Sequence, residues 1–191
     1  HMFPHELSTG LCSLNPQVDR LVQSCLMEVD KGTGAVVRYE MHDGVIHSRA
    51  RMTYTAVNGV LTDRDPALLE QYAPLVPLFE LMRELFATLN ERRRRRGSID
   101  FDLPEAEVIL DQAGEIAAIV RSERNIAHRI IEEFMLLANE AVATQLINLK
   151  IPTIHRVHES PDPKRLNDYR QDVLSHNIPC GNIEKTAEVQ K

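Results

Sequence analysis

Apolar side chains recur every three or four residues between positions 124 and 149. This period places them in one sector of an α-helix and predicts a long helix that packs against a core along that side. His128 and Glu132 form a narrow polar stripe just off the apolar sector. A further side carries charged residues that we expect to face solvent, namely Arg129, Glu133 and Glu140.

A second helical pattern covers residues 78–89, where leucine, methionine and phenylalanine repeat at the same spacing. Pro74 and Pro77 suit the first turn of this helix. Its end is expected at Gly97, directly after the run Arg92–Arg96, because basic side chains favour the negative end of the helix dipole.

Alternating or β-rich segments around turn residues predict two β-hairpins. The first joins residues 21–29 to 35–41, and the second joins residues 98–110 to 115–120. A turn at 42–44 predicts a separate strand over residues 45–54, in which Arg49 and Arg51 share one face.

Shorter patterns complete the expected fold. Thr53 or Thr55 is expected to cap a short helix that runs through Val60. Residues 153–157 are a candidate strand, and residues 166–174 a modest final helix. Antiparallel hairpins packed with two long helices define an α+β fold.

Size and composition fit one globular domain, since 191 residues with 43% apolar side chains can form a sizeable core. We interpret residues 1–2 as a cloning scar and residues 3–191 as a single domain cut from a longer protein. Three cysteines without close pairing favour a reducing cytoplasm. No apolar stretch is long enough to cross a bilayer, so no membrane partner is expected.

The net charge of −6 argues only mildly against nucleic-acid binding, because the arginine run concentrates positive charge. Taken alone, that run is more often a solvated helix end. Tyr54 beside Arg49 and Arg51 could stack on a base next to a phosphate, or simply fill a corner of the fold. His128 and Glu132 stand four residues apart and could hold a metal ion or a ligand, or form an ordinary surface pair.

Several segments, taken in order, resemble the catalytic domain of the ribonuclease II and ribonuclease R family. The segments that carry the resemblance are residues 6–16 with Asp19-Arg20, residues 51–54, residues 96–101, residues 127–139 and residues 156–159. The resemblance runs over residues 3 to about 160 and implies the fold and activity of that family.

Members of this family are processive 3′-to-5′ exoribonucleases that release 5′-mononucleotides from single-stranded RNA, with magnesium as cofactor. The resemblance implies that the aspartates that hold the metal precede the segment matched here. We therefore expect no catalytic or metal-binding residue in this chain, no tightly bound Mg²⁺, and no exonuclease activity of the chain alone.

The resemblance also implies three RNA-binding residues. Tyr54 and Glu132 would contact the ribose near the 3′ end, and Phe101 would stack on a base. Backbone phosphates have further candidates, which are Arg49, Arg51, Arg92, Arg94 and Arg96.

Two other readings remain open at this point. One is a non-catalytic RNA-binding module of the same fold. The other is an unrelated metal-dependent hydrolase that uses His128, Glu132, His155 and His158. The sequence leaves the oligomeric state undetermined.

Overall fold

The computed structural model describes residues 2–99, 105–122, 124–157 and 159–183. The chain divides into two compact units, described here one at a time. The first contains His1–Phe86 and Asn125–Ile151, and the second contains Ala87–Arg124 and Pro152–Lys191. Helices and antiparallel hairpins occur together, which confirms the predicted α+β class.

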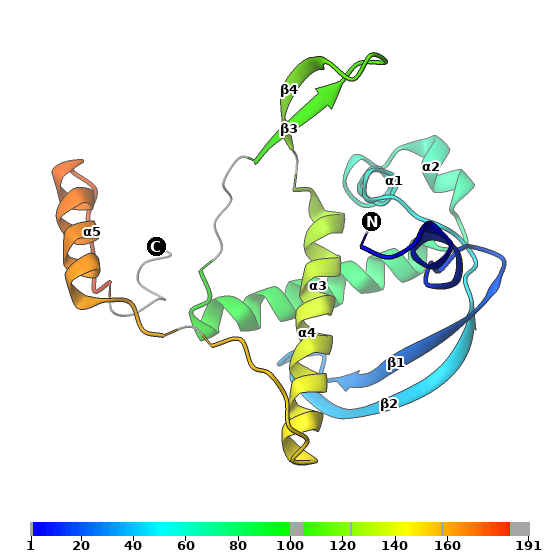
Figure 1. Cartoon of the computed structure of the whole chain (residues 1–191), viewed down its shortest axis with the longest axis horizontal. Coiled ribbons are helices and arrows are strands. Elements are labelled where there is room, and N and C mark those ends of the chain that lie inside the picture. Colours follow the sequence, from blue (N-terminus) through cyan, green and yellow to red (C-terminus); the bar gives the residue numbers. More distant parts are fainter. Residues whose placement is uncertain (1, 100–104, 123, 158, 184–191) are drawn as a thin grey trace. The chain divides into compact units, whose positions relative to one another are not determined.

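The first unit contains a long, curved antiparallel ribbon made of β1 (Asp19–Val29) and β2 (Val36–His47) (Figure 1). Asp30 closes the turn between the strands, since its Oδ1 accepts hydrogen bonds from the backbone N and the Oγ1 of Thr33. These two bonds, at 2.7 and 2.6 Å, lower the pKa of the Asp30 carboxyl from its ordinary value. The first predicted hairpin is therefore confirmed.

The prediction of a separate strand over residues 45–54 is wrong. β2 continues through the expected turn at 42–44, because β1 is long enough to pair with all three residues, from Ser24 opposite His42 to Val22 opposite Gly44. Residues 48–53 belong to no strand. Arg49 and Arg51 therefore do not share a strand face.

Helix α1 (Tyr54–Asn58) begins where its sequence predicts. The Oγ1 of Thr53 accepts a hydrogen bond from the backbone N of Ala56, which satisfies one of the free N–H groups of the first turn. The helix continues directly into the π-helical segment η2 (Gly59–Asp63), and α2 (Pro66–Gln71) follows. Neither η2 nor α2 is apparent from apolar spacing, and neither is the π-helical η1 (Glu6–Leu11).

Helix α3 (Val76–Arg96) ends at Gly97, as the sequence predicts. Gly97 has φ +86°, and its backbone N donates to the carbonyl of Arg94 while Ser98 donates to Arg93. This is a Schellman ending, which needs a left-handed residue at the position that glycine occupies. Lys150 takes the same left-handed position, with φ 54°, after helix α4 (Ile126–Asn148).

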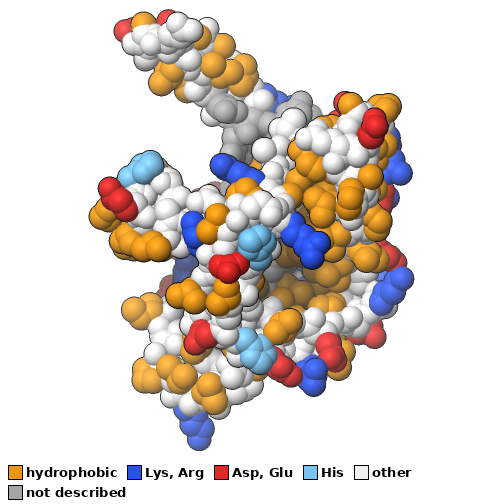
Figure 2. Space-filling view, turned by 90° about the vertical axis from the view of Figure 1, so that its right-hand side faces the viewer, with side chains coloured by type: hydrophobic (Ala, Val, Ile, Leu, Met, Phe, Trp, Pro, Cys, Tyr) orange, Lys and Arg blue, Asp and Glu red, His pale blue; other side chains and the backbone are white. Residues whose placement is uncertain are grey.

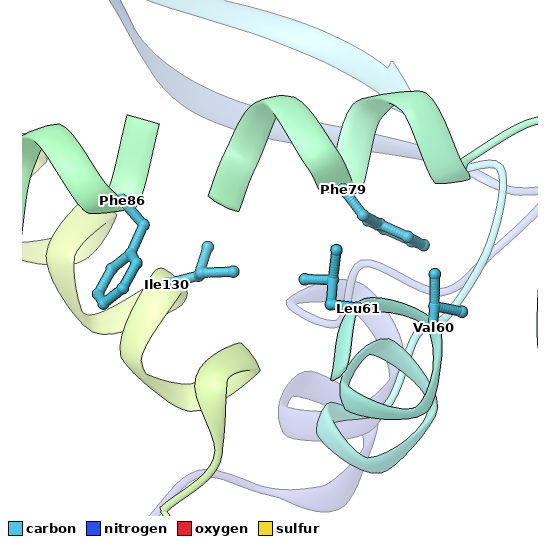
Figure 3. Packing of buried hydrophobic residues seen from close by; sticks show 5 residues of the cluster. All are labelled: Val60, Leu61, Phe79, Phe86 and Ile130. Atoms are coloured by element: carbon cyan, nitrogen blue, oxygen red, sulfur yellow. The ribbon is translucent and has the colours of Figure 1, made fainter. Parts of the chain in front are cut away.

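Helix α4 (Ile126–Asn148) contributes Ile130 to the core of the first unit. Figure 3 shows Phe79 of α3 pointing toward Val60 and Leu61 of η2, with Phe86 of α3 beside Ile130. These five side chains are the buried residues of one cluster. Burying their apolar surface fixes α3, α4 and η2 against one another.

The solvent-facing side predicted for α4 needs a correction. Glu133 is only 6% exposed, and the guanidinium of Arg129 lies 5.2 Å from the centre of the Phe86 ring. Helix α4 contacts both α1 and β1, so more of its circumference is covered than a single apolar stripe requires. Glu140 is exposed, as expected.

The second unit contains the antiparallel hairpin of β3 (Glu105–Leu110) and β4 (Ile116–Ser122), which confirms the second predicted hairpin over these residues. Residues 98–99 of the predicted first strand are not in a strand, and residues 100–104 lie outside the described residues. Helix α5 (Pro163–Ser175) includes the predicted helix at 166–174, and Asp162 caps it through a 2.7 Å bond from the backbone N of Lys164. The strand predicted at 153–157 is wrong, since these residues have no strand structure and belong to neither of the described sheets. Both sheets that the structure describes have two strands.

Candidate functional site

The first unit contains a cavity of about 440 Å³ between α1, α3 and α4. Its lining is almost entirely apolar, with one basic side chain, Arg51, and one phenol, Tyr54, among the residues that border it. The other lining residues are Met52, Thr53, Val57, Leu61, Phe79, Met82, Ala127, Ile130 and Ile131. An apolar cavity with a few polar groups is the usual form of a ligand-binding site.

Tyr54, the first residue of α1, stacks on His128 near the start of α4. The two ring centroids lie 3.9 Å apart and the ring planes are inclined by 25°. Tyr54 is 45% exposed, so part of its side chain is accessible to a ligand. Within the described part of the chain, the Tyr54 hydroxyl makes no hydrogen bond.

Asn125 fixes the start of α4 and the imidazole together. Its Oδ1 accepts hydrogen bonds from the backbone N of Ala127 and of His128, at 3.1 and 3.3 Å. The same oxygen lies 2.9 Å from Nδ1 of His128. The helix cap and the orientation of the ring therefore depend on one side chain.

Glu132 lies one helical turn after His128 on α4, so the two side chains share a side of the helix. It is partly exposed. Because Tyr54 stacks on His128, the structure brings Tyr54 close to the side of α4 that carries Glu132. Tyr54 and Glu132 therefore lie on two helices of the first unit that contact each other, α1 and α4.

The arginine candidates fall into two groups. Arg49 and Arg51 are exposed and belong to the first unit, and Arg51 borders the cavity. The run Arg92–Arg96 belongs to the second unit, where Arg95 pairs with Glu91 at 2.9 Å. The arginine run and the cavity therefore belong to different units of the chain.

Two other predicted residues cannot be placed at this site. Phe101 and His158 lie outside the residues that the structure describes. Among the described residues, no group of three His, Cys, Asp or Glu side chains is arranged to hold a metal ion. The ring of His128 is instead engaged by Tyr54 and Asn125.

Sequence patterns did not predict the contact between Tyr54 and His128, nor the cavity beneath it. The two rings are far apart along the chain, and no local period connects them. One usable signal existed, because Asn125 directly precedes an apolar helical run and asparagine is a preferred N-cap.

Figure 2 shows one face of the molecule, on which many apolar side chains (orange) remain exposed among scattered charged ones.

None of the helices in the described ranges is both long enough and apolar enough to span a membrane. This finding concerns those helices only.

Comparison with known proteins gives a consistent result. The chain is 44% identical over 168 residues to ribonuclease R of Aquifex aeolicus, which covers 88% of this chain and 24% of that protein. Mycoplasma genitalium RNase R in complex with ribose methylated single-stranded RNA matches 99% of this chain, and this chain covers 30% of it, with a TM-score of 0.85 and 29% identity. The same enzyme in complex with double-stranded RNA matches 99% of this chain, which covers 34% of it, with a TM-score of 0.84 and 28% identity.

The chain spans about a quarter of the length of the first curated relatives that it matches. The family model described as RNB domain matches residues 1–190, nearly the whole sequence. This match agrees with the resemblance seen in the sequence and rules against an unrelated metal hydrolase. The chain belongs to the RNB domain family.

Proposed function

We propose that this chain is part of a processive 3′-to-5′ exoribonuclease that hydrolyses single-stranded RNA to 5′-mononucleotides. Residues 3–191 would form one domain of that enzyme and supply a wall of its RNA channel. The relatives named ribonuclease R and the solved RNase R complexes with RNA support this assignment. The free cysteines Cys12, Cys25 and Cys180 fit a cytoplasmic enzyme.

The observation that carries the proposal is the position of Tyr54 beside the side of α4 that bears Glu132. A phenol can donate or accept a hydrogen bond, and a carboxylate can accept one. A ribose 2′-hydroxyl offers both functions, and it is the group that distinguishes RNA from DNA. Tyr54 and Glu132 would therefore contact the ribose and favour RNA, while the apolar cavity beside them receives neighbouring parts of the nucleotide.

Positive charge near this site would hold the RNA backbone. Arg51 borders the cavity and Arg49 lies two residues before it. Neither has a side-chain partner among the described residues, so both guanidinium groups are available to phosphate oxygens. Three residues of the arginine run would contact phosphates elsewhere along the RNA strand, namely Arg92, Arg94 and Arg96. Phe101 would stack on a base.

Phosphodiester hydrolysis in this family would require magnesium, which activates the attacking water and stabilises the leaving oxygen. The described residues do not fit this role, because no three metal-binding side chains lie together. The part played by these residues would therefore be to bind and orient the RNA.

The first test compares RNA with DNA of the same sequence. The 191-residue chain is titrated against fluorescent single-stranded RNA and DNA oligonucleotides, and affinity is followed by anisotropy. RNA is expected to bind more tightly, and Glu132→Ala to reduce this preference by about three- to tenfold, the usual effect of losing one hydrogen bond. Glu140→Ala, an exposed carboxylate of the same helix, is the matched control. Equal preference in Glu132→Ala and the unsubstituted chain would overturn the ribose contact.

A second test concerns charge and activity. Arg51→Gln should make the dependence of RNA affinity on salt shallower by about 0.7 in the logarithmic slope, the value expected for one phosphate contact on a single strand. An unchanged slope contradicts that contact. The purified chain is expected to release no mononucleotides with magnesium present, and magnesium-dependent release would refute the assignment of these residues to RNA binding alone.

A further inference from the structure

We propose that His128 is a positioning residue, which holds the ring of Tyr54 so that its hydroxyl meets the same nucleotide as Glu132. The inference rests on the proposed function, since it explains how the ribose contact is oriented. His128 itself need not touch RNA. Its contribution would come from the ring stack, 3.9 Å between centroids, and from the Asn125 side chain that fixes the imidazole.

The stack matters because Tyr54 is otherwise weakly held. Its ring is 45% exposed and its hydroxyl has no hydrogen-bond partner in the described part of the chain. A half-exposed tyrosine normally changes side-chain rotamer rapidly. Stacking on His128 restricts that motion before any ligand binds, which lowers the entropy lost when RNA is bound.

The hydrogen bond to Asn125 identifies the ring nitrogen of His128 that acts as the donor. Two backbone N–H groups, those of Ala127 and His128, donate to the Asn125 side chain, and such groups can only donate. The acceptor is therefore the amide oxygen, and the hydrogen bond to the ring must be donated by Nδ1 of His128. Nδ1 carries the proton, and the ring cannot rotate without losing this bond.

Both rings are attached to capped helix starts, which makes the arrangement rigid. The Oγ1 of Thr53 caps α1 directly before Tyr54, and Asn125 caps α4 three residues before His128. Helices α1 and α4 are in contact, and Ala127 and Tyr54 border the same cavity. The ring pair therefore connects two fixed backbones at the rim of the cavity, and Glu132 follows one turn along α4.

Two substitutions of His128 distinguish the contribution of its ring from that of its hydrogen bond to Asn125. His128→Gln removes the ring but keeps a favourable helix start, because asparagine at the N-cap with glutamine three residues later forms a capping box. His128→Phe keeps a ring that can stack on Tyr54 and loses the bond to Asn125. Tyr54→Leu removes the residue that His128 is proposed to position. Circular dichroism checks that the helix content of each variant is unchanged.

The readout is the ratio of RNA to DNA affinity, measured by anisotropy with the 191-residue chain. His128→Gln should lower this ratio about three- to tenfold, the effect of losing one aromatic stack, and His128→Phe should restore most of it. In the Tyr54→Leu background, His128→Gln should have no further effect, because the residue that it positions is already gone. A purely structural role would weaken RNA and DNA binding equally, so that the ratio would not change, and would lower both affinities further in the Tyr54→Leu background.

The outcomes distinguish this inference from the proposed function. If Tyr54→Leu lowers the ratio and His128→Gln does not, the ribose contact stands and the positioning role is overturned. If neither substitution lowers the ratio, the ribose contact fails and the positioning role fails with it. A lowered ratio in both single variants, without addition in the double variant, supports the inference.

Discussion

Ile130 offers a direct test of the core that supports the site. It is 1% exposed and packs with Phe79, Phe86 and Leu61, whereas its neighbour Ile131 is 44% exposed and borders the same cavity. Substituting either isoleucine by alanine removes the same atoms. The two variants therefore differ only in how much of the removed side chain was buried and packed.

The magnitudes follow from burial. Ile130→Ala removes three buried carbons worth about 0.8 kcal/mol each, or about 2.4 kcal/mol in total. The residual void adds to this, although less than in a closed core because Ile130 already borders a cavity, so we expect about 3 kcal/mol. Ile131→Ala should cost about 1 kcal/mol, since nearly half of that side chain is exposed. The gain in helix propensity is the same for both and cancels.

The measurement is urea unfolding followed by far-ultraviolet circular dichroism, with the free energies of unfolding extrapolated to water. A difference of about 2 kcal/mol between the two variants is expected. Costs that agree within about 0.5 kcal/mol would refute the reasoning, because Ile130 could not then be the better packed residue.

Three other predictions use local features. Gly97→Ala places a side chain at φ +86° and should lower the free energy of unfolding by about 1 kcal/mol. Lys150→Gly relieves a left-handed position of the same kind and should raise it by a similar amount. Urea midpoints that move in the same direction would contradict one of these two expectations. Thr33→Val removes one of the donors that lower the pKa of Asp30, so that pKa should rise toward its ordinary value in a carbon-detected NMR titration. The folded pKa of Asp30 lies below the unfolded one, so its stabilising effect is present above the unfolded pKa and is lost as the pH falls through the folded value; an unchanged titration in Thr33→Val would reject this cause.

Regular patterns in the sequence predicted the elements that depend on local signals. The two long helices, both hairpins, the Thr53 cap and the end at Gly97 agree with the structure, because periodicity, capping and turn chemistry are properties of neighbouring residues. The strand expected at 45–54 failed for the opposite reason. The turn residues at 42–44 are accommodated within β2 because the facing strand extends past them, which no local pattern reveals.

The candidate site was predicted only in part. Tyr54 and Glu132 were proposed from the family resemblance, and the structure places Tyr54 against His128, one turn before Glu132. The stack itself, the cavity and the burial of Glu133 all depend on contacts between helices distant in sequence. Such contacts are set by packing in three dimensions, so residue spacing alone could not supply them.

The two-stranded ribbons have a consequence for how the isolated chain behaves in concentrated solution. Each strand has only one ladder partner among the described residues, which leaves its other edge able to accept a foreign strand. The β1–β2 ribbon carries Arg38 and Glu40, charges that discourage such intermolecular pairing. In β3–β4 the charged residues, Glu105, Glu107 and Arg121, all lie toward the end away from the turn, and residues 108–110 and 116–120 are apolar. Ile109 and Ile119 are exposed there, so self-association should start at this part of the hairpin.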